Sequence, residues 1–501
     1  MLSRLLAIKN VESNAESSHL KRVLGSFELT MLGIGAIIGT GIFVLTGTAA
    51  AGGDNHIGAG PALVISFLIT AVACGLAALC YAEFASMIPV SGSAYTYAYA
   101  SFGELVAWII GWDLILEYAV GNIAIAIGWS GYMLNLLQFF NIHPPAWLCI
   151  DPMTASHAIA HAADANPQTL ELAKQAYATA PNLGFPLIIN LPAVLVVLLV
   201  STLLYFGVKE SARFNSVLVL IKLAMIALFL VAGLPHVDFA THWQPFAPNG
   251  FSGIMTGAAI IFFAYIGFDA VSTTAEEAKN PQRDLPIGMI GSLLICTVLY
   301  IAVAIVLTGM APLSVLKSPK PVAAALNAVN ATGIANIISL GAVLSITSVL
   351  VVMQFGQTRI FYAMSRDGLL PKVLSKVHPK FKTPHVCTLL TGILVAIPAG
   401  LIDIGVAAEV SNIGTLFAFI LVAVGIMILR VRDPQKSRGF KTPLVWIVAP
   451  GCVITCFALM YYLTPITWIR FGIWMVIGLV FYFVYGYRNS ELAKQEMAKV
   501  A

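Results

Sequence analysis

Long, continuously apolar runs recur along this 501-residue chain and constrain its fold more than any other feature. The hydrocarbon core of a bilayer is about 30 Å thick and needs roughly 20 apolar residues per helix. Twelve segments reach that length, at 30–51, 61–88, 103–140, 187–208, 213–234, 251–275, 286–310, 332–363, 386–402, 405–429, 443–463 and 466–487. The runs are continuous rather than alternating, which excludes a membrane β-barrel. The sequence therefore predicts an all-α polytopic membrane protein with twelve transmembrane helices.

The composition excludes the soluble classes of protein. Hydrophobic residues make up 59% of the chain and charged residues 10%, against roughly 45–50% and about 25% in an average soluble domain. So few charges cannot cover the surface of a water-soluble protein of this length. A soluble enzyme, a disulfide scaffold and a disordered chain are excluded, and the lipid bilayer is the expected partner. The net charge of +4 comes from basic residues in short loops, so no nucleic-acid partner is expected.

The placement of lysine and arginine predicts the orientation in the membrane. With the N-terminus in the cytoplasm, 22 of the 27 basic residues fall in cytoplasmic segments. The opposite loops hold Lys174, Lys317 and Lys320, and Lys222 and Arg470 lie inside apolar runs. This bias is the positive-inside pattern, so both termini are expected in the cytoplasm. The first 29 residues lack the apolar core of a cleaved signal peptide, and none is expected.

One predicted extracytoplasmic loop, 142–186, is longer than the others. It contains His157 and His161, four residues apart in HAIAH, a spacing that binds metal on a helix. No third ligand has a matching spacing, so a solvated helical cap is the favoured interpretation and no metal is expected. The seven cysteines show neither a metal-ligand spacing nor a disulfide framework.

The first apolar run contains MLGIGAIIGTGIFVLTG, with five glycines and no charge. It fails the dinucleotide-binding fingerprint, because Ile38 stands where a third glycine is required. One interpretation is close helix packing through small residues. The alternative is a broken helix, unwound at Gly39, Thr40 and Gly41, whose second half points free amides and a positive dipole end at an anion. Such helices form midplane sites in transporters built from inverted repeats.

An inverted repeat predicts a second interrupted helix five spans later, and the sixth run reads FFAYIGFDAVSTTAEEAKNP. Gly267 and Asp269 interrupt this run, with Tyr265, Phe262 and Phe263 beside them. Unwound carbonyls here would accept an ammonium group that Asp269 complements. Alternatively, Asp269 only caps the second half of the broken helix.

Lys222 is the most unusual single residue of the chain. It lies nine residues past Arg213, roughly 13 Å along a helix, which is too deep for its side chain to reach the near interface. An ionisable residue at such a depth is a functional hypothesis. Its amine would accept and release a proton, and its ammonium would take the place of a coupling cation against first-helix carbonyls. A purely structural lysine is the alternative.

Other polar residues of the apolar runs carry weaker predictions. Asp113 and Glu117 stand four apart in the third run and share one helix face, and Glu117, the deeper of the two, is expected to face the substrate or a proton path. Glu83 and Glu409 are expected near membrane ends with structural roles. Met353 of the eighth run is a candidate for the pocket wall, with plain packing as the alternative.

Three motifs, GIGAIIGTGIF, FFAYIGFDAVSTTAEEAKNPQRDLP and RIFYAMSRDGLLPKVLSKVHPKFKTP, closely resemble the amino acid–polyamine–organocation superfamily. The cationic amino acid transporter subgroup and its bacterial relatives fit best, over nearly all of residues 25–487. The resemblance implies the LeuT-like fold, with inverted five-helix repeats at 30–234 and 251–430 and two further helices at 443–487. The segments 1–29 and 488–501 are then cytoplasmic, in a bacterial inner membrane.

The resemblance also implies where a substrate amino acid binds. Its carboxylate would meet first-helix amides at Thr40 and Gly41, and its α-ammonium would meet carbonyls around Ile37 and Phe263, with Asp269 near.

For coupling, the resemblance matches Lys222 to the fifth-helix lysine of proton-coupled members and Glu117 to an acidic pocket residue. The predicted substrate-binding residues are Ile37, Gly39, Thr40, Gly41, Glu117, Phe263, Tyr265, Gly267, Asp269 and Met353.

The expected function is secondary active import of L-amino acids by alternating access, coupled to protons, by a monomer without cofactors. A fixed cationic side chain would need an acceptor at the far end of the pocket. If Met353 and Phe263 line that end, neutral amino acids such as alanine are favoured over cationic ones. The alternatives are an amino-acid or polyamine exchanger without net proton movement and, more remotely, a nutrient sensor. The apolar runs contain no catalytic arrangement, so no enzyme is expected.

Overall fold

The computed structural model describes residues 23–53, 56–87, 93–162, 165–182, 184–207 and 212–492, together with Ile8 and Lys494. Most of the predicted N-terminal segment 1–29 and the end of the tail therefore lie outside the described residues. The regular elements are helices. The long ones are α3 (Ser26–Ile37), α5 (Leu63–Met87), α7 (Glu104–Phe139), α10 (Leu191–Phe206), α11 (Ala212–Gly233), α13 (Gly250–Ile261), α14 (Pro281–Met310), α17 (Thr332–Arg366), α18 (His385–Ala399), α19 (Ile404–Arg432), α20 (Val445–Tyr461) and α21 (Pro465–Phe481).

Shorter helices link or continue these long ones. They are η1 (Gly41–Leu45), α4 (Thr46–Ala51), η2 (Gly60–Ala62), α6 (Ser93–Ser101), η3 (Ala146–Leu148), α8 (Pro152–Ala160), α9 (Pro167–Thr179), η4 (Leu234–His236), α12 (Phe239–His242), η5 (Phe262–Tyr265), η6 (Asp269–Glu277), α15 (Leu313–Leu316), α16 (Pro321–Ala328), η7 (Lys372–Ser375), η8 (Tyr482–Gly486) and α22 (Tyr487–Asn489).

The helices match the predicted apolar runs in position. Among the described residues, eight helices are long and apolar enough to cross a membrane, and one bent pair, Ser26–Ile37 with Gly41–Ala51, passes the same test. Three shorter apolar helices, α10, α18 and α20, coincide with the remaining runs. These helices confirm the polytopic all-α class. Helices suit a bilayer because they satisfy their own backbone hydrogen-bonding groups in lipid. The count of twelve crossings, the inverted repeat and the division into segments stay predictions.

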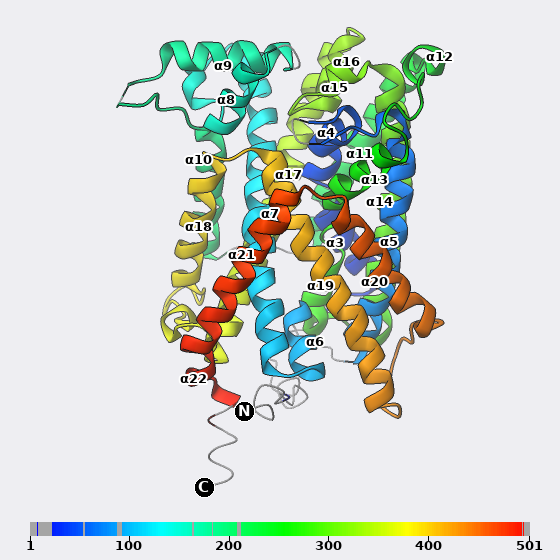
Figure 1. Ribbon diagram of the computed structural model, residues 1–501, viewed down its shortest axis with the longest axis vertical. Coiled ribbons are helices and arrows are strands. Elements are labelled where there is room, and N and C mark those ends of the chain that lie inside the picture. The colour runs from blue at the N-terminus through cyan, green and yellow to red at the C-terminus, as the bar shows by residue number, and fades with distance from the viewer. Residues whose placement is uncertain are drawn as a thin grey trace.

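The two helices with predicted breaks lie inside the bundle. The most apolar window of Gly250–Ser272 is completely buried, whereas that of Pro465–Asn489 is 22% buried. Around them, α3 packs on α14 and α11, and α7 packs on α17 and α19. Figure 1 shows α8, α9, α12 and α16 at one end of the bundle and α6 and α22 at the other.

A buried ion cluster closes the end of the bundle where α5 ends. The Glu83 carboxylate accepts hydrogen bonds from Arg430 Nε (2.7 Å) and a second guanidinium nitrogen of Arg430 (2.8 Å), and Arg438 Nε lies 3.0 Å away. The Thr442 N–H also donates to it (2.8 Å). Removing one partner of such a cluster costs about 3–5 kcal/mol, so these contacts support the predicted structural role of Glu83.

The predicted loop 142–186 folds into α8 and α9, which lie over α10 (Figure 1). The pair has a small apolar core of its own, made of Ile150, Ala155, Ala158, Ala173, Ala176 and Ile188. Asp151 caps α8 by accepting from the Thr154 N–H (2.8 Å), and the Thr154 hydroxyl donates to Asp403 at the start of α19 (3.3 Å). The predicted helical cap is therefore present, and it is packed rather than merely solvated. The His157 and His161 rings stack at 4.2 Å, and no third metal-type ligand joins them among the described residues.

Candidate functional site

The first break separates α3 from η1. Ile38 leaves the helical region with ψ 103°, and the second half continues at an angle of 40° to the first. Thr40 already has helical dihedrals, φ −55° and ψ −33°. The predicted unwinding of Gly39, Thr40 and Gly41 is thus shifted and shortened to Ile38 and Gly39. A π-helical turn, Gly41–Leu45, accommodates the change of direction, so the residues after Gly39 stay helical.

The second half of the first broken helix begins with unbonded donors. Its first backbone bond runs from the Phe43 N–H to the Gly39 oxygen (3.3 Å), and the first amides of a helix have no acceptor within it. The amides of Thr40 and Gly41 therefore lie at a positive dipole end that favours an anion. The Thr40 hydroxyl is buried and has no hydrogen-bond partner among the described residues. These donors together suit a carboxylate.

The second break follows η5. Ile266 is extended with ψ 135°, and Gly267 has φ +120°, a conformation that favours glycine. A Cβ atom at Gly267 would lie 3.0 Å from the backbone of Ala36, so the two broken helices touch at this glycine. The chain turns helical again at Asp269. The predicted interruption of the sixth run is therefore present.

A cavity of about 20 Å³ lies where the two breaks meet. That volume holds about one water molecule, so the walls must separate to admit an amino acid. The lining residues come from α3 and η1, from α7, from η5 and the residue after it, and from α17. They are Ala36, Ile37, Gly39, Thr40, Gly41, Ile125, Phe263, Ile266, Val349 and Met353. None of these lining residues is charged, and the walls beyond the first break are apolar.

The cavity thus brings together six of the predicted substrate-binding residues: Ile37, Gly39, Thr40, Gly41, Phe263 and Met353. The others lie outside its lining. Tyr265 donates its hydroxyl to the Phe67 oxygen (3.2 Å) on α5. The Asp269 side chain accepts from the backbone N–H groups of Gly267 and Ala270, and its role as ligand or cap stays a prediction.

Glu117 also lies outside the cavity lining, on the face of α7 that meets α19. The Ser411 hydroxyl donates to its backbone oxygen (3.3 Å), and its carboxyl group lies beside Thr415. Asp113, one turn earlier on the same face, has no partner for either carboxyl oxygen among the described residues. Roles for these acids in binding or coupling stay predictions.

Lys222 of α11 reaches the first break. Its Nζ donates to the backbone oxygens of Gly35 (2.5 Å) and Ile38 (3.1 Å), and the side chain is 1% exposed. In an unbroken helix these carbonyls would accept from residues four positions later, bonds that the break disrupts. The predicted contact between the ammonium and first-helix carbonyls is therefore present. Its role in coupling stays a prediction.

Tyr300 of α14, which sequence reasoning missed, bridges the two breaks. Its hydroxyl lies 2.9 Å from the Ile37 oxygen and 3.0 Å from the Ala264 oxygen, so one proton is shared by a carbonyl of each broken helix. The Ile37 carbonyl, predicted to meet a substrate ammonium, already has this donor and keeps a second lone pair. The available sequence signal was a hydroxyl in the middle of an apolar run, where it needs a partner.

Comparison with known proteins gives matches over almost the whole chain. The sequence profile described as amino acid permease matches residues 24–483. The chain is 45% identical over 493 residues to the methylthioribose transporter of Bacillus subtilis (strain 168), covering 98% of this chain and 99% of that protein. It is 45% identical over 483 residues to the branched-chain amino acid permease BcaP of the same organism, covering 96% and 97%. It is 39% identical over 429 residues to the chloroplastic cationic amino acid transporter 9 of Arabidopsis thaliana, covering 85% and 69%.

Proposed function

The chain belongs to the amino acid permease family, and from this membership we propose that it imports L-amino acids by proton-coupled alternating access, with neutral amino acids favoured over cationic ones. The observation that carries the proposal is that one cavity is lined from both broken helices. Midplane sites between broken helices are typical of secondary transporters. The transporter lies in the cytoplasmic membrane with both termini inside, as the excess of basic residues in the predicted inner segments supports.

In the proposed binding mode, each break supplies one half of the recognition of an amino acid. The free amides of Thr40 and Gly41, with the Thr40 hydroxyl, bind the carboxylate. Carbonyls at Ile37 and Phe263 accept from the α-ammonium. The side chain then extends toward Met353, where the walls offer no acceptor for a cationic group. Burying an unpaired cation there would be costly, which supports a neutral substrate.

Lys222 carries the proposed coupling step. Its ammonium donates to Gly35 and Ile38 and holds α3 against α11. The neutral amine has fewer protons to donate, so it binds these carbonyls more weakly. Release of the proton would then favour movement of α3 and shift the balance between the two access states.

A second substrate class is favoured by one comparison. The relative named as a methylthioribose transporter is as similar to this chain as the relative named as a branched-chain amino acid permease. A thioether sugar would fit the apolar wall near Met353 but would leave the carboxylate-binding amides without an anion. We therefore place amino acids first and test methylthioribose beside them.

The test is uptake into proteoliposomes, with and without an inward proton gradient. The panel contains alanine, leucine, arginine, lysine, putrescine and methylthioribose. We expect alanine and leucine to accumulate above equilibrium only when the gradient is present. Uptake that ignores the gradient but requires amino acid inside would establish an exchanger, and accumulation of methylthioribose alone would overturn the substrate class.

Lys222→Ala tests the coupling residue. We expect it to abolish gradient-driven accumulation while alanine counterflow continues at a measurable rate. Lys174→Ala, in α9 of the cap and far along the chain from the breaks, is the matched control and should behave as wild type. Unchanged gradient-driven uptake by Lys222→Ala would contradict the proposed coupling step without affecting the substrate assignment.

A further inference from the structure

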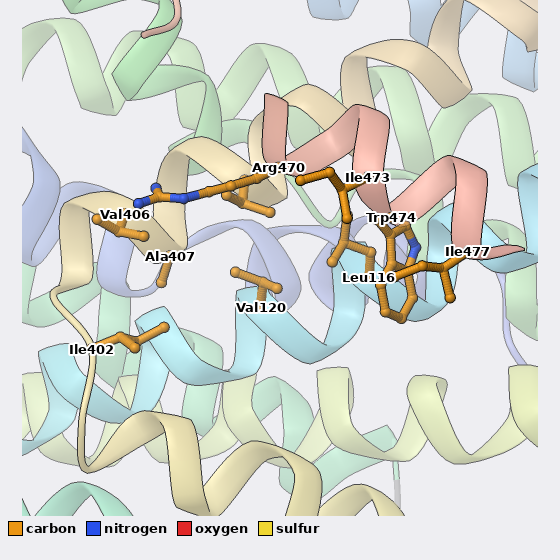
Figure 2. Close-up of a pocket in the computed structure, with 10 residues that line it drawn as sticks. Leu116, Val120, Ile402, Val406, Ala407, Arg470, Ile473, Trp474 and Ile477 are labelled. Carbon is orange, nitrogen blue, oxygen red and sulfur yellow. The ribbon is translucent and has the colours of Figure 1, made fainter. Parts of the chain in front are cut away.

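A second cavity, of about 260 Å³, lies away from the substrate site, between α7, α19 and α21 (Figure 2). Leu116 and Val120 line it from α7, and Ile473 and Ile477 line it from α21. Arg470 is the one charged member of its lining. We call this cavity the α21 crevice.

Contacts between α7 and α21 fix the walls of the α21 crevice at the end where Trp474 lies. Trp112 of α7 and Trp474 of α21 donate to each other's backbone oxygens (2.9 and 3.1 Å), and their rings stack at 4.6 Å. These reciprocal bonds hold α21 against α7 at the end of the crevice where Trp474 lies.

The other end of α21 is fixed against α19. Glu409 accepts hydrogen bonds from the hydroxyls of Thr464 and Thr467, the latter at 2.6 Å. The crevice therefore lies between two sets of helix–helix contacts, and these contacts hold its walls apart.

Arg470 places a cation at one end of this apolar space. Figure 2 shows its guanidinium extending toward Val406, whereas Trp474, Ile477 and Leu116 gather at the other end. Among the described residues, Arg470 has no ion pair or hydrogen bond. A guanidinium within a membrane span is costly unless an anion or water accepts its hydrogen bonds.

Lipid is the medium that meets this face of the molecule. The Ile473 and Ile477 side chains are 57% and 50% exposed in a helix long and apolar enough to span a membrane. Arg470 is the sixth residue of α21, about 7.5 Å from its start, and Ile477 lies about 10.5 Å deeper at 1.5 Å per residue. The cation thus lies in the outer part of this segment, toward the cap, and the apolar walls follow it deeper into the hydrocarbon.

We propose that the α21 crevice binds one anionic phospholipid, in the leaflet on the side of the cap. Its phosphate binds the Arg470 guanidinium, which suits bidentate recognition of phosphate oxygens. One acyl chain lies along Val120, Leu116 and Ile473. This site lies outside the proposed transport mechanism, and its test does not depend on the substrate.

Charge favours an anionic phospholipid over a zwitterionic one. The ammonium of a zwitterionic headgroup would need an acceptor, and Glu409 of α19 already accepts from two hydroxyls. The volume of about 260 Å³ is below the range of pockets for whole drug-sized ligands, which fits a segment of one chain. A second protein copy would have to bury the unpaired cation of Arg470.

Native mass spectrometry of the delipidated full-length protein tests the proposal. We expect phosphatidylglycerol to bind one per chain and tighter than phosphatidylethanolamine. Arg470→Gln should weaken phosphatidylglycerol about tenfold, because a charge-assisted hydrogen bond is lost, and should leave phosphatidylethanolamine unchanged. Arg488→Gln, at the opposite end of the same helical segment, is the matched control and should bind both lipids as wild type does.

Two further measurements separate the acyl chain from the phosphate. Val120→Phe fills the part of the crevice assigned to the acyl chain while keeping Arg470, and it should weaken both lipids. Glycerol phosphate, which has no acyl chain, should not compete. Undiminished phosphatidylglycerol binding by Arg470→Gln, tight binding of glycerol phosphate, or a dimer cross-linked through Ile473→Cys that excludes lipid would each overturn the proposal. Unchanged melting temperatures of the lipid-free variants establish that they are folded.

Discussion

At the scale of the single residue, the hydroxyl of Tyr300 links the two broken helices of the candidate site. It donates between the carbonyls of Ile37 and Ala264, one from each broken helix. In the hydrocarbon region no bulk water would replace it. A carbonyl left without a donor there costs about 1–3 kcal/mol. The relative position of the two breaks is therefore set in part by a side chain of a third helix.

Tyr300→Phe tests this bridge with the smallest possible change. We expect a loss of about 1–3 kcal/mol in stability and a marked fall in transport, because the two breaks lose their shared donor. Tyr265→Phe is the control, since the Tyr265 hydroxyl bonds Phe67 on α5 and touches neither break. Melting temperature and initial uptake rate measure the two effects. Equal loss of transport in both variants would show that the bridge has no special role.

Met353 is expected to limit the size of the substrate side chain. It lines the cavity together with other apolar side chains. Met353→Ala should raise uptake of larger amino acids relative to alanine, by about tenfold or more, because each methylene in such a pocket is worth about 1–3 kcal/mol. Met289→Ala, a buried methionine of α14 outside the lining, is the control. Competition assays with leucine and alanine give the ratio, and an unchanged ratio would remove Met353 from the pocket wall.

At the scale of the element, the two broken helices were predictable because glycine and charge interrupt otherwise apolar runs. The sequence locates Gly39 and Gly267 correctly, since membrane helices tolerate such residues only where other groups satisfy the backbone. It does not locate those satisfying groups. Tyr300 and the pair Trp112–Trp474 act across helices far apart in the chain, and no local pattern encodes such partners. Asp269 was ambiguous because a cap and a ligand use the same side chain.

Gly41→Ala tests how closely the broken helices must approach. A Cβ atom at Gly41 would overlap the backbone of Ala264, so the two halves would have to move apart. We expect transport to fall by at least tenfold, together with a destabilisation of about 1–3 kcal/mol from overpacking. Gly75→Ala, where an added Cβ meets nothing within 4 Å, should leave both unchanged. Wild-type uptake by Gly41→Ala would contradict a close contact between the breaks.

At the scale of the whole molecule, the cap formed by α8 and α9 contacts the membrane bundle through the bond from Thr154 to Asp403, and Asp151 caps its helix α8. Burial raises the pKa of Asp151 from 3.8 to about 6, and the nearby Asp403 adds to the rise. The folded cap therefore holds a proton more tightly than the unfolded segment does. The stability that Asp151 contributes to the cap is full below about pH 4 and is lost as the pH rises through about 6.

We therefore expect the cap to open more often at neutral pH than in acid. Hydrogen-exchange protection factors in residues 146–189, corrected for intrinsic exchange rates, should fall between pH 5 and pH 7.5. The whole pKa shift corresponds to about 3 kcal/mol, of which about 1.4 kcal/mol is lost between pH 5 and pH 7.5. Asp151→Asn keeps an N-cap side chain and should abolish the pH dependence, whereas the exposed Asp238→Asn should not. Protection that rises with pH would contradict the sign.

If transport is coupled as proposed, the contact between Lys222 and the first break also limits how much energy the proton gradient supplies per substrate molecule. A metal ion lying between helices leaves with its whole charge and can be joined by a second ion. An amine fixed to α11 by covalent bonds never leaves the protein, so it can surrender only a single hydrogen ion in each turnover. The free energy available to move each substrate molecule is then at most that of one proton crossing the membrane. A higher ratio of inside to outside substrate concentration would require a second titrating group.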